Sequence, residues 1–363
     1  MADLDLLFSS LQLGDITLSN RAVMAPLTRS RAIGGVPNAL MASYYSQRAS
    51  AGLIITEGTA PSPNGLGYPR IPGIFSEAQI EGWRETTEAV HARGGHIFLQ
   101  LMHTGRIGHP NNLPDGAEVL APSAVTAAGE MYTDAAGMQP HPQPKAMTTD
   151  DIEAAIGEYI TAAENAIRAG FDGIEIHAAN GYLANQFLNP RSNQRDDAWG
   201  GSPERRNHFV LEVARQTAAA IGGGRTGIRL SPHGVFNDLG PYDGIDDQYA
   251  SLAEGLGALK LAYLHLVDHS SLGAPEVPAA LKATLRTRFG GTIILSGGYD
   301  AARAEADLQA GRGELVAFGR PFLANPDLLD RFKAEAPLNA PRPELFYTPG
   351  PEGYVDYPLL SES

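Results

Sequence analysis

A short stretch near the middle of the chain carries three side chains suited to carbonyl chemistry. In GFDGIEIHAANGYLANQF, residues 170–187, an apolar run is followed by His177, Asn180 and Tyr182. Two neutral hydrogen-bond donors that converge on one point can hold a carbonyl oxygen and stabilise the enolate that it becomes. A phenol with an ordinary pKa near ~10 can protonate a strongly basic carbanion. The stretch therefore predicts a catalytic cluster.

The same residues admit a structural explanation and a metal-binding one. The same sequence would result if the residues were purely structural, with a core histidine whose nitrogens are satisfied, an asparagine in a turn and a packed tyrosine. His103 and His177 both fall near the ends of apolar runs and could ligate zinc, but catalytic zinc usually takes three protein ligands. No His-x-His pair and no suitably placed carboxylate accompanies them. We therefore favour a catalytic cluster and expect no metal.

Two further polar side chains, Gln100 and Arg229, lie inside apolar runs. An inward side chain of this kind is costly to bury without partners. The edge of a planar ligand rich in carbonyl and N–H groups would satisfy both residues. An internal hydrogen-bond network, or an outward orientation beneath a helix, would also satisfy them, and the residues alone leave these explanations open.

Glycines near the ends of two later apolar runs suggest an anion site. Gly297 and Gly298 follow one run, and Gly319 with Arg320 follows the next. Glycine lets the backbone approach an anion closely, and arginine offers a fork of donors that suits phosphate oxygens. Such glycines can also serve only tight turns. Their occurrence after two successive runs favours a phosphate site.

The chain alternates between short apolar runs and segments of helical period. Amphipathic helices are expected over 77–95 and 151–171, and Ser202-Pro203-Glu204 has the residues of a helix start. Strands alternating with helices indicate parallel βαβ units. Eight buried strands are expected at 22–28, 53–59, 96–102, 173–179, 226–232, 262–268, 292–298 and 315–321.

Eight such units close into a (β/α)₈ barrel, which typically takes ~250 residues. We therefore predict an α/β fold, a single TIM barrel domain over residues 1–363, with loop insertions mainly at 103–147, 183–201 and 233–245 and a tail beyond about 335. An open doubly wound sheet is less favoured, because no dinucleotide-type glycine fingerprint occupies the first turn. The active site of such a barrel forms at the C-terminal strand ends, where the polar residues above fall.

Composition limits the partners and the compartment. The formal net charge of −14 over 363 residues disfavours nucleic acid and anionic lipid as partners. The absence of cysteine excludes disulfides and thiolate chemistry and suits the cytoplasm. No apolar run approaches the ~20 residues of a membrane span, and the acidic N-terminus is unlike a signal peptide. We expect a cytoplasmic protein, either a monomer or a weak homo-oligomer.

Long motifs in a fixed order resemble the Old Yellow Enzyme family of FMN-dependent ene-reductases, and especially its bacterial N-ethylmaleimide reductase and xenobiotic reductase type. The similarity runs from about residue 6 to the end and is carried by MAPLTR, YYSQRASAGLIITEGT, GLGYPRIPGIFS, LQLMHTGR, GFDGIEIHAANGYLANQFL, WGGSPERRNHF, FGRPFLANPDL and EGYVDYP. The resemblance implies a barrel that holds one FMN without a covalent bond. It also implies NADPH or NADH as the reductant and small activated alkenes as substrates.

The resemblance implies roles for individual residues. His177 and Asn180 would bind the substrate carbonyl, Tyr182 would supply the proton, and Tyr68 would approach the substrate from the far side. Hydride would pass from the nicotinamide to flavin N5 and then to an alkene bearing a carbonyl, imide or nitro group. The residues implied to contact FMN are Pro26, Leu27, Thr28 and Ala60 along the isoalloxazine, Gln100, His177 and Arg229 around its polar edge, Gly298, Gly319 and Arg320 at the phosphate, and Tyr347 near the dimethylbenzene edge.

One position departs from the family pattern. The family often carries tryptophan after Gln-Leu in the third strand, where this chain has Met102, and a slimmer, flexible side chain predicts a roomier substrate pocket. The loop at 129–145 matches the family less well and receives no role.

Three other functions are compatible with parts of this pattern. Reduction of nitrate esters or nitroaromatics would use the same flavin and donors, so the sequence does not separate it from alkene reduction. A flavin-binding protein without turnover is disfavoured by the presence of Tyr182 and both donors. A barrel aldolase would need a Schiff-base lysine or a metal, and no lysine falls at a strand end.

Overall fold

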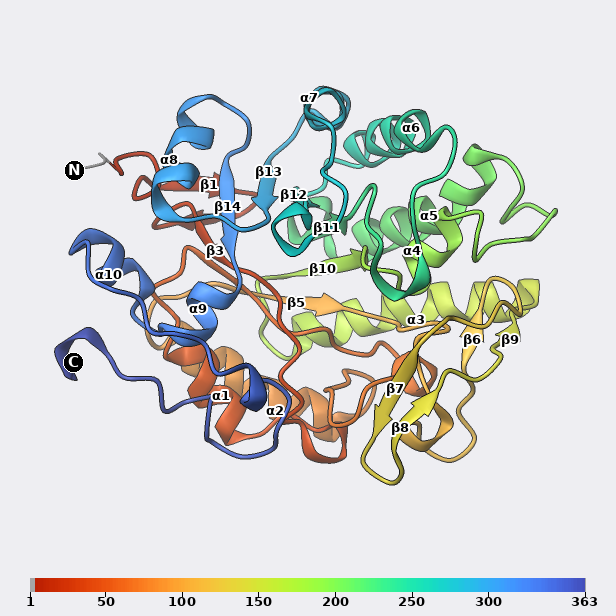
Figure 1. The fold of residues 1–363 in the computed structure, drawn as a ribbon, viewed down its shortest axis with the longest axis horizontal. Helices are drawn as coiled ribbons and strands as arrows, with labels where there is room; N and C mark the ends of the chain where they lie inside the picture. The colour runs from red at the N-terminus through yellow and green to blue at the C-terminus, as the bar shows by residue number, and fades with distance from the viewer. Residues whose placement is uncertain (1–3, 363) are drawn as a thin grey trace.

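The computed structural model describes residues 4–362 and shows a closed, parallel, eight-stranded barrel surrounded by helices (Figure 1). The predicted fold class is therefore confirmed. Around the barrel the strands follow the order β10-β11-β12-β13-β14-β3-β4-β5, and β10 pairs with β5 to close the ring. The strands are β3 (Ala22–Met24), β4 (Leu53–Ile55), β5 (Ile97–Leu101), β10 (Gly173–Ala178), β11 (Thr226–Leu230), β12 (Tyr263–Val267), β13 (Ile293–Ser296) and β14 (Leu315–Phe318).

Every predicted strand is present, but each is shorter than expected at its C-terminal end. The run at 22–28 pairs only as far as Met24, because Pro26 has no backbone N–H to continue the ladder. The run at 292–298 ends at Ser296, where Gly297 turns the chain with φ +139°. The residues beyond these ends form the loops of the candidate site.

The outer layer contains helices that begin at recognisable caps. In α2 the Ser76 side chain accepts from the Gln79 backbone N–H and the Gln79 side chain reciprocates, and α5 begins at Pro203 with Ser202 as its cap. The helices are α1 (Ala39–Ser46), α2 (Glu77–His91), α3 (Thr149–Arg168), α4 (Leu183–Leu188), α5 (Pro203–Ile221), α6 (Ile245–Ala258), α7 (Ala279–Phe289), α8 (Ala301–Gln309), α9 (Arg320–Ala324) and α10 (Leu328–Lys333).

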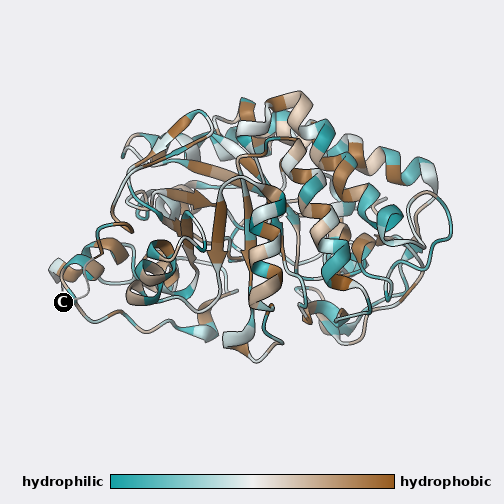
Figure 2. Ribbon diagram, turned by 90° about the horizontal axis from the view of Figure 1, so that it is seen from above, coloured by the Kyte–Doolittle hydropathy of each residue, from teal (hydrophilic) through white to brown (hydrophobic). Residues whose placement is uncertain are grey.

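Alternation along the strands separates two apolar cores. In β3, Ala22 and Met24 pack in the core between strands and helices, whereas Val23 packs in the barrel interior. A hairpin of β1 (Leu11–Leu13) and β2 (Ile16–Leu18) adds Leu13 and Leu18 to the interior core at its lower end. Figure 2 shows the central strands predominantly apolar and the helices with mixed surfaces. The barrel interior toward the N-terminal ends of the strands, which we call its lower end, is thus filled by apolar side chains.

The long segment between β5 and α3 is organised into small strands of its own. Strands β7 (Glu130–Thr133) and β8 (Gly137–Pro140) form an antiparallel hairpin, and β6 (Leu120–Ala121) pairs with β9 (Lys145–Ala146). The hairpin coincides with most of the 129–145 loop and extends outward on the side of the barrel where β5 and β10 end (Figure 1).

One buried arginine ties the C-terminal tail to the barrel. The Arg31 guanidinium, 1% exposed, donates to the carbonyl oxygens of Leu345, Phe346, Gly350 and Glu352 at 2.7–3.2 Å. A guanidinium can satisfy several carbonyl groups at once because its donors point outward in a fixed plane. Arg31 therefore holds more main-chain oxygens of the tail than Arg29, which binds those of Phe346 and Gly353, or Arg70, which binds that of Tyr347.

Replacing Arg31 with Met should release the tail. The change removes the donors to Leu345, Gly350 and Glu352, while the Phe346 oxygen keeps its bond from Arg29, so we expect a loss of about 3 kcal/mol in the free energy of unfolding. Hydrogen exchange of residues 345–354 should rise strongly in the variant. Arg84→Met, which removes an exposed arginine on α2, is the matched control and should change neither quantity appreciably. Unchanged exchange in the tail would contradict the anchoring role.

Candidate functional site

The end of strand β10 places the three predicted catalytic residues together. His177 is the last inward-facing residue of the strand, because Ile176 and Ala178 belong to the outer core. Asn180 then turns the chain with φ +58°, and Tyr182 stands at the start of α4. The rings of His177 and Tyr182 meet edge to face with centroids 5.0 Å apart. The structure thus brings the sequence-predicted cluster to one point at the upper end of the barrel.

His177 is buried and lacks a protein partner. Its Nδ1 has no hydrogen bond within the described part of the chain, although the side chain is only 3% exposed. Burial, followed by the charge of Arg229, lowers the pKa of His177 well below its usual value. The ring is therefore neutral at pH 7 and carries one N–H. An unpartnered buried nitrogen of this kind indicates a ligand.

Asn180 is held by residues from two neighbouring loops. Its backbone N–H donates to Ser231 Oγ at 2.9 Å, and its carbonyl oxygen accepts from Asn237 Nδ2 at 2.7 Å. Its side-chain oxygen lies 2.8 Å from His269 Nε2. The amide nitrogen has no hydrogen-bond partner among residues 4–362 and is free to donate.

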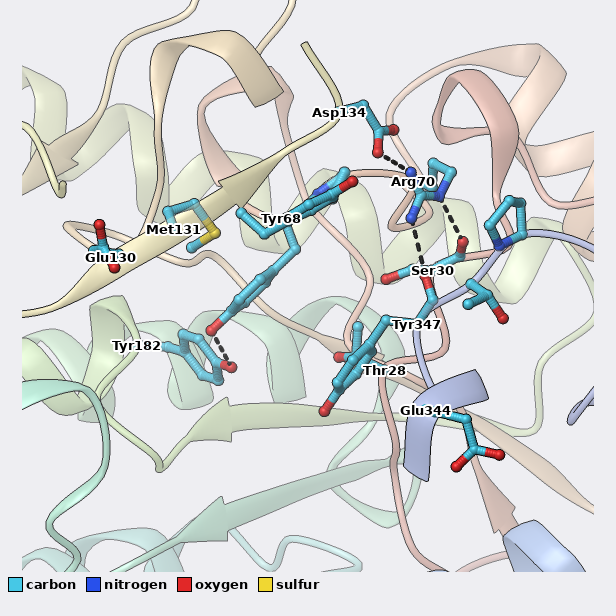
Figure 3. A pocket seen from close by; sticks show the side chains of 14 residues that line it. Thr28, Ser30, Tyr68, Arg70, Glu130, Met131, Asp134, Tyr182, Glu344 and Tyr347 are labelled. Atoms are coloured by element: carbon cyan, nitrogen blue, oxygen red, sulfur yellow. Dashed lines mark hydrogen bonds and ion pairs between the residues drawn. The ribbon is translucent and has the colours of Figure 1, made fainter. Parts of the chain in front are cut away.

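Tyr182 shares a hydrogen bond with the other predicted substrate-side tyrosine. The hydroxyls of Tyr182 and Tyr68 lie 3.0 Å apart and point toward one another across the cavity (Figure 3). Burial raises the pKa of Tyr182, and the hydrogen bond from Tyr68 offsets this only in part. The phenol consequently stays protonated at neutral pH, as an acid must be before it donates.

A buried polar layer lies in the barrel interior around Glu175, which precedes His177 on the inward face. Its two carboxylate oxygens are 2.7 Å from Gln100 Nε2 and 2.8 Å from His265 Nδ1. Burial alone would raise the pKa of Glu175, but His265, Arg229 and the bond from Gln100 together lower it. The carboxylate is therefore ionised and compensates the charge of Arg229. Of the three explanations left open for Gln100, the internal hydrogen-bond network is present.

Arg229 differs from Gln100 in having no partner that satisfies its donors. No hydrogen bond joins its guanidinium to the described residues, its Nε is fully enclosed, and the side chain is 7% exposed. A buried guanidinium without acceptors is very costly unless a ligand supplies them. The electron-rich pyrimidine edge of a flavin has the acceptors that Arg229 lacks, so this part of the site fits FMN.

The glycine turns fit the phosphate end of FMN. The backbone N–H groups of Gly298 and Gly319 donate to none of the described residues. A Cβ on Gly319 would come no closer than 3.7 Å to a protein atom, so packing does not require glycine there. A Cβ on Gly297, in contrast, would lie 2.0 Å from the Asp268 carbonyl oxygen. Gly297 is explained by packing, whereas Gly319 leaves room for a ligand beside Arg320, which is exposed.

A cavity of about 740 Å³ opens beside Tyr68 and Tyr182 (Figure 3). It contains four of the predicted site residues. Its lining is Thr28, Ser30, Tyr68, Pro69, Arg70, Glu130, Met131, Tyr132, Asp134, Tyr182, Glu344, Tyr347, Thr348 and Pro349. Ala60 and Met102 do not line it: Ala60 is fully buried, and Met102, 1% exposed, packs its thioether against the backbone at Gly58. A wider pocket at Met102 thus remains a prediction.

Arg70 joins three segments at the rim of this cavity. Its guanidinium donates to the Ser30 carbonyl oxygen at 3.1 Å, to the Tyr347 carbonyl oxygen at 2.9 Å, and forms an ion pair with Asp134 of the hairpin (Figure 3). We call this arrangement the Arg70 clasp. It connects the loop after β3, the C-terminal tail and the β7–β8 hairpin.

Sequence reasoning missed several residues of the site. The 129–145 loop received no role, yet its hairpin places Met131 against Tyr68 and Tyr182. Glu175 carried a usable signal, since it stands two residues before His177 and therefore faces the same side of the strand. His269 and Asn237 carried none, because their contacts with Asn180 join positions 89 and 57 residues apart.

Residues 4–362 lack the features of two other kinds of site. No group of three or more His, Asp or Glu side chains is arranged to hold a metal ion. No helix there has the length and apolar character needed to cross a membrane.

Comparisons with known proteins agree with this geometry. Residues 6–339 match the NADH:flavin oxidoreductase / NADH oxidase family. A probable flavin mononucleotide-dependent alkene reductase of Leishmania infantum is 40% identical, with 98% of both chains covered. Morphinone reductase, solved in complex with tetrahydroNAD, superposes with a TM-score of 0.93 at 46% identity over 98% of this chain and 97% of its own. The old yellow enzyme homologue from Zymomonas mobilis gives 0.94 at 41% identity, over 98% and 99%.

The chain belongs to the Old Yellow Enzyme family. It is an FMN-dependent oxidoreductase that uses NAD(P)H to reduce activated carbon–carbon double bonds, as the sequence predicted. Membership of this family agrees with the fit of Arg229 and the glycine turns to a flavin.

The charge of Glu175 should influence a flavin bound in this Old Yellow Enzyme barrel. In Glu175→Gln, Arg229 loses its compensating carboxylate, so the site becomes more positive and should favour the reduced, more negative flavin. We expect the midpoint potential of bound FMN to rise by tens of millivolts, where about 30 mV for two electrons corresponds to about 1.4 kcal/mol.

Stability of the FMN-free protein should also fall in Glu175→Gln, by about 3 kcal/mol, because a buried charge is left unpaired. Glu164→Gln, an exposed position on α3, is the matched control. A potential equal to that of the wild type would exclude an electrostatic role for Glu175.

Proposed function

We propose that His177 and Asn180 bind the oxygen of the activating group and that Tyr182 protonates the substrate. The observation that carries the proposal is the gathering of three groups at one strand end: a neutral imidazole without a protein partner, an amide nitrogen without a described partner, and a protonated phenol whose contact there is the Tyr68 hydroxyl. Hydrogen bonds to the developing enolate strengthen as charge accumulates on oxygen, so they lower the barrier to addition at the β-carbon.

FMN, when bound, would supply the hydride chemistry, accepting a hydride from the nicotinamide and giving it to the alkene. The chain's own residues orient the substrate and handle the proton. His177 and Asn180 fix the oxygen, which places the α-carbon near Tyr182. Tyr182 then gives its hydroxyl proton to that carbon, and Tyr68, hydrogen-bonded to Tyr182 and lining the cavity, returns a proton to it from the solvent side.

We assign the FMN-contacting residues in the same way. Arg229 and Gln100 serve the pyrimidine edge, with His177 beside them, and the free hydroxyl of Thr28 donates from the cavity wall. The remaining contacts are proposed for Pro26, Leu27 and Ala60 along the ring, Gly298, Gly319 and Arg320 at the phosphate, and Tyr347 near the dimethylbenzene edge. Support comes from the unpartnered donors of Arg229 and of the two glycines.

The proposed substrates are small alkenes activated by a carbonyl, imide or nitro group. The relatives are named for alkene and morphinone reduction. The cavity wall combines four tyrosines with a methionine and two prolines, and two of its four charged side chains, Arg70 and Asp134, pair with one another, which leaves room for an apolar skeleton with one polar group. We further propose one domain over 1–363, a monomer or weak homo-oligomer, and a cytoplasmic location, the last supported by the absence of cysteine.

Tyr182→Phe should separate the two half-reactions. Reduction of bound FMN by nicotinamide should stay near the wild-type rate, whereas reduction of a weakly activated enone such as 2-cyclohexenone should slow by roughly 10²–10⁴-fold if Tyr182 is the general acid. Stopped-flow measurement of each half-reaction provides the comparison. Tyr132→Phe removes another cavity-lining hydroxyl and is the matched control. Rapid enone reduction by Tyr182→Phe would refute the assignment.

The pH dependence of alkene reduction follows from the raised pKa of Tyr182. An acid whose pKa is raised keeps its proton above its ordinary range, so the rate should not decline between pH 6 and 9 through loss of the Tyr182 proton. A fall centred below pH 9 in the wild type that is absent from Tyr182→Phe would contradict this expectation.

A further inference from the structure

The orientation of the Asn180 side chain determines whether it can act as a donor. A carboxamide presents NH₂ on one side and a carbonyl oxygen on the other, and a half-turn about its last torsion exchanges them. Only the NH₂ side attracts a substrate oxygen, while the opposite orientation would repel it. The backbone of Asn180 is already fixed by Ser231 and Asn237, so this half-turn is the freedom that remains.

His269 lies where it can settle that choice. It follows β12, and its Nε2 is 2.8 Å from the Asn180 side-chain oxygen. The Phe236 ring packs on it with centroids 4.5 Å apart, which limits competing contacts with water. With the oxygen of Asn180 engaged by His269, its NH₂ group must occupy the other side of the carboxamide.

The charge state of His269 is consistent with a donor role. Burial, and then the nearby charge of Arg229, lower its pKa to about 4, so the ring is neutral at pH 7. A neutral imidazole carries its single N–H on one nitrogen, and an amide oxygen can only accept, so the hydrogen resides on Nε2.

We propose that His269 is a positioning residue that holds the Asn180 carboxamide with its NH₂ group toward the substrate oxygen. This inference rests on the donor role proposed above for Asn180. It adds to that role a third residue, from a different strand end, that need not touch the substrate. A donor at position 269 binds the oxygen of Asn180 and leaves its NH₂ group for the ligand. An acceptor at position 269 would bind the NH₂ group and leave the oxygen for the ligand.

Three substitutions at His269 distinguish orientation from packing. Gln retains a side-chain N–H and should preserve the arrangement. Leu removes the donor and lets the amide rotate, and Glu offers only acceptors, which should turn the NH₂ of Asn180 away from the ligand. The probe is 4-hydroxybenzaldehyde, whose phenolate oxygen competes for the same donors, titrated into the FMN-loaded protein.

We expect the dissociation constant of the probe to stay within about twofold for His269→Gln, to rise roughly 3- to 10-fold for His269→Leu, and to rise by roughly 30-fold or more for His269→Glu. FMN content should be equal in all variants. His208→Leu on the outer helix α5 is the control for loss of a histidine and should bind as the wild type does. Equal affinities for the Leu, Glu and wild-type proteins would overturn the proposal.

The Asn180→Ala background separates this inference from the one on which it rests. If Asn180 is a donor, Asn180→Ala alone weakens probe binding, and adding His269→Leu then changes it by less than about twofold because no carboxamide remains to orient. An undiminished effect of His269→Leu in that background would show that His269 acts independently of Asn180 and overturn the inference. Unweakened binding in Asn180→Ala would instead refute the donor role itself.

Discussion

Closure of the barrel is the constraint from which the site follows. In a closed parallel ring every second residue of each strand must point inward, and the interior is too narrow to leave those side chains in water. The lower interior is filled by apolar residues such as Phe98 and Ile294. Closer to the C-terminal strand ends the inward positions are Gln100, Glu175 and Arg229. The inward residues thus change from apolar to polar along the strands, and this change separates a stabilising core from a binding site.

The members of the polar layer satisfy one another only in part. Glu175 is fully engaged by Gln100 and His265, which keeps a carboxylate ionised in the interior. Arg229 receives charge compensation from that carboxylate but no acceptor for its N–H groups. The layer therefore has the composition of a receptor: its internal bonds hold it rigid, and its remaining donors are directed to a ligand.

Local patterns in the sequence were sufficient for the architecture and for half of the site. Apolar runs of the right length identified all eight strands, and the spacing of His177, Asn180 and Tyr182 marked the strand end that carries them. Strand ends were predicted too long, because apolar residues continue into loops that pack without pairing. The contacts of His269 and of the hairpin at 130–140 could not be predicted, since they depend on which distant loops meet above the barrel.

The Arg70 clasp has a consequence for how the rim of the cavity responds to salt. Two of its three attachments are to main-chain oxygens, whereas the third, to Asp134, is an ion pair whose acid is about half exposed. Dissolved ions screen such a pair but scarcely affect the other two bonds. Rising ionic strength should therefore weaken the attachment of the hairpin to Arg70 more than that of the tail, at the side of the cavity where the hairpin contributes to the wall.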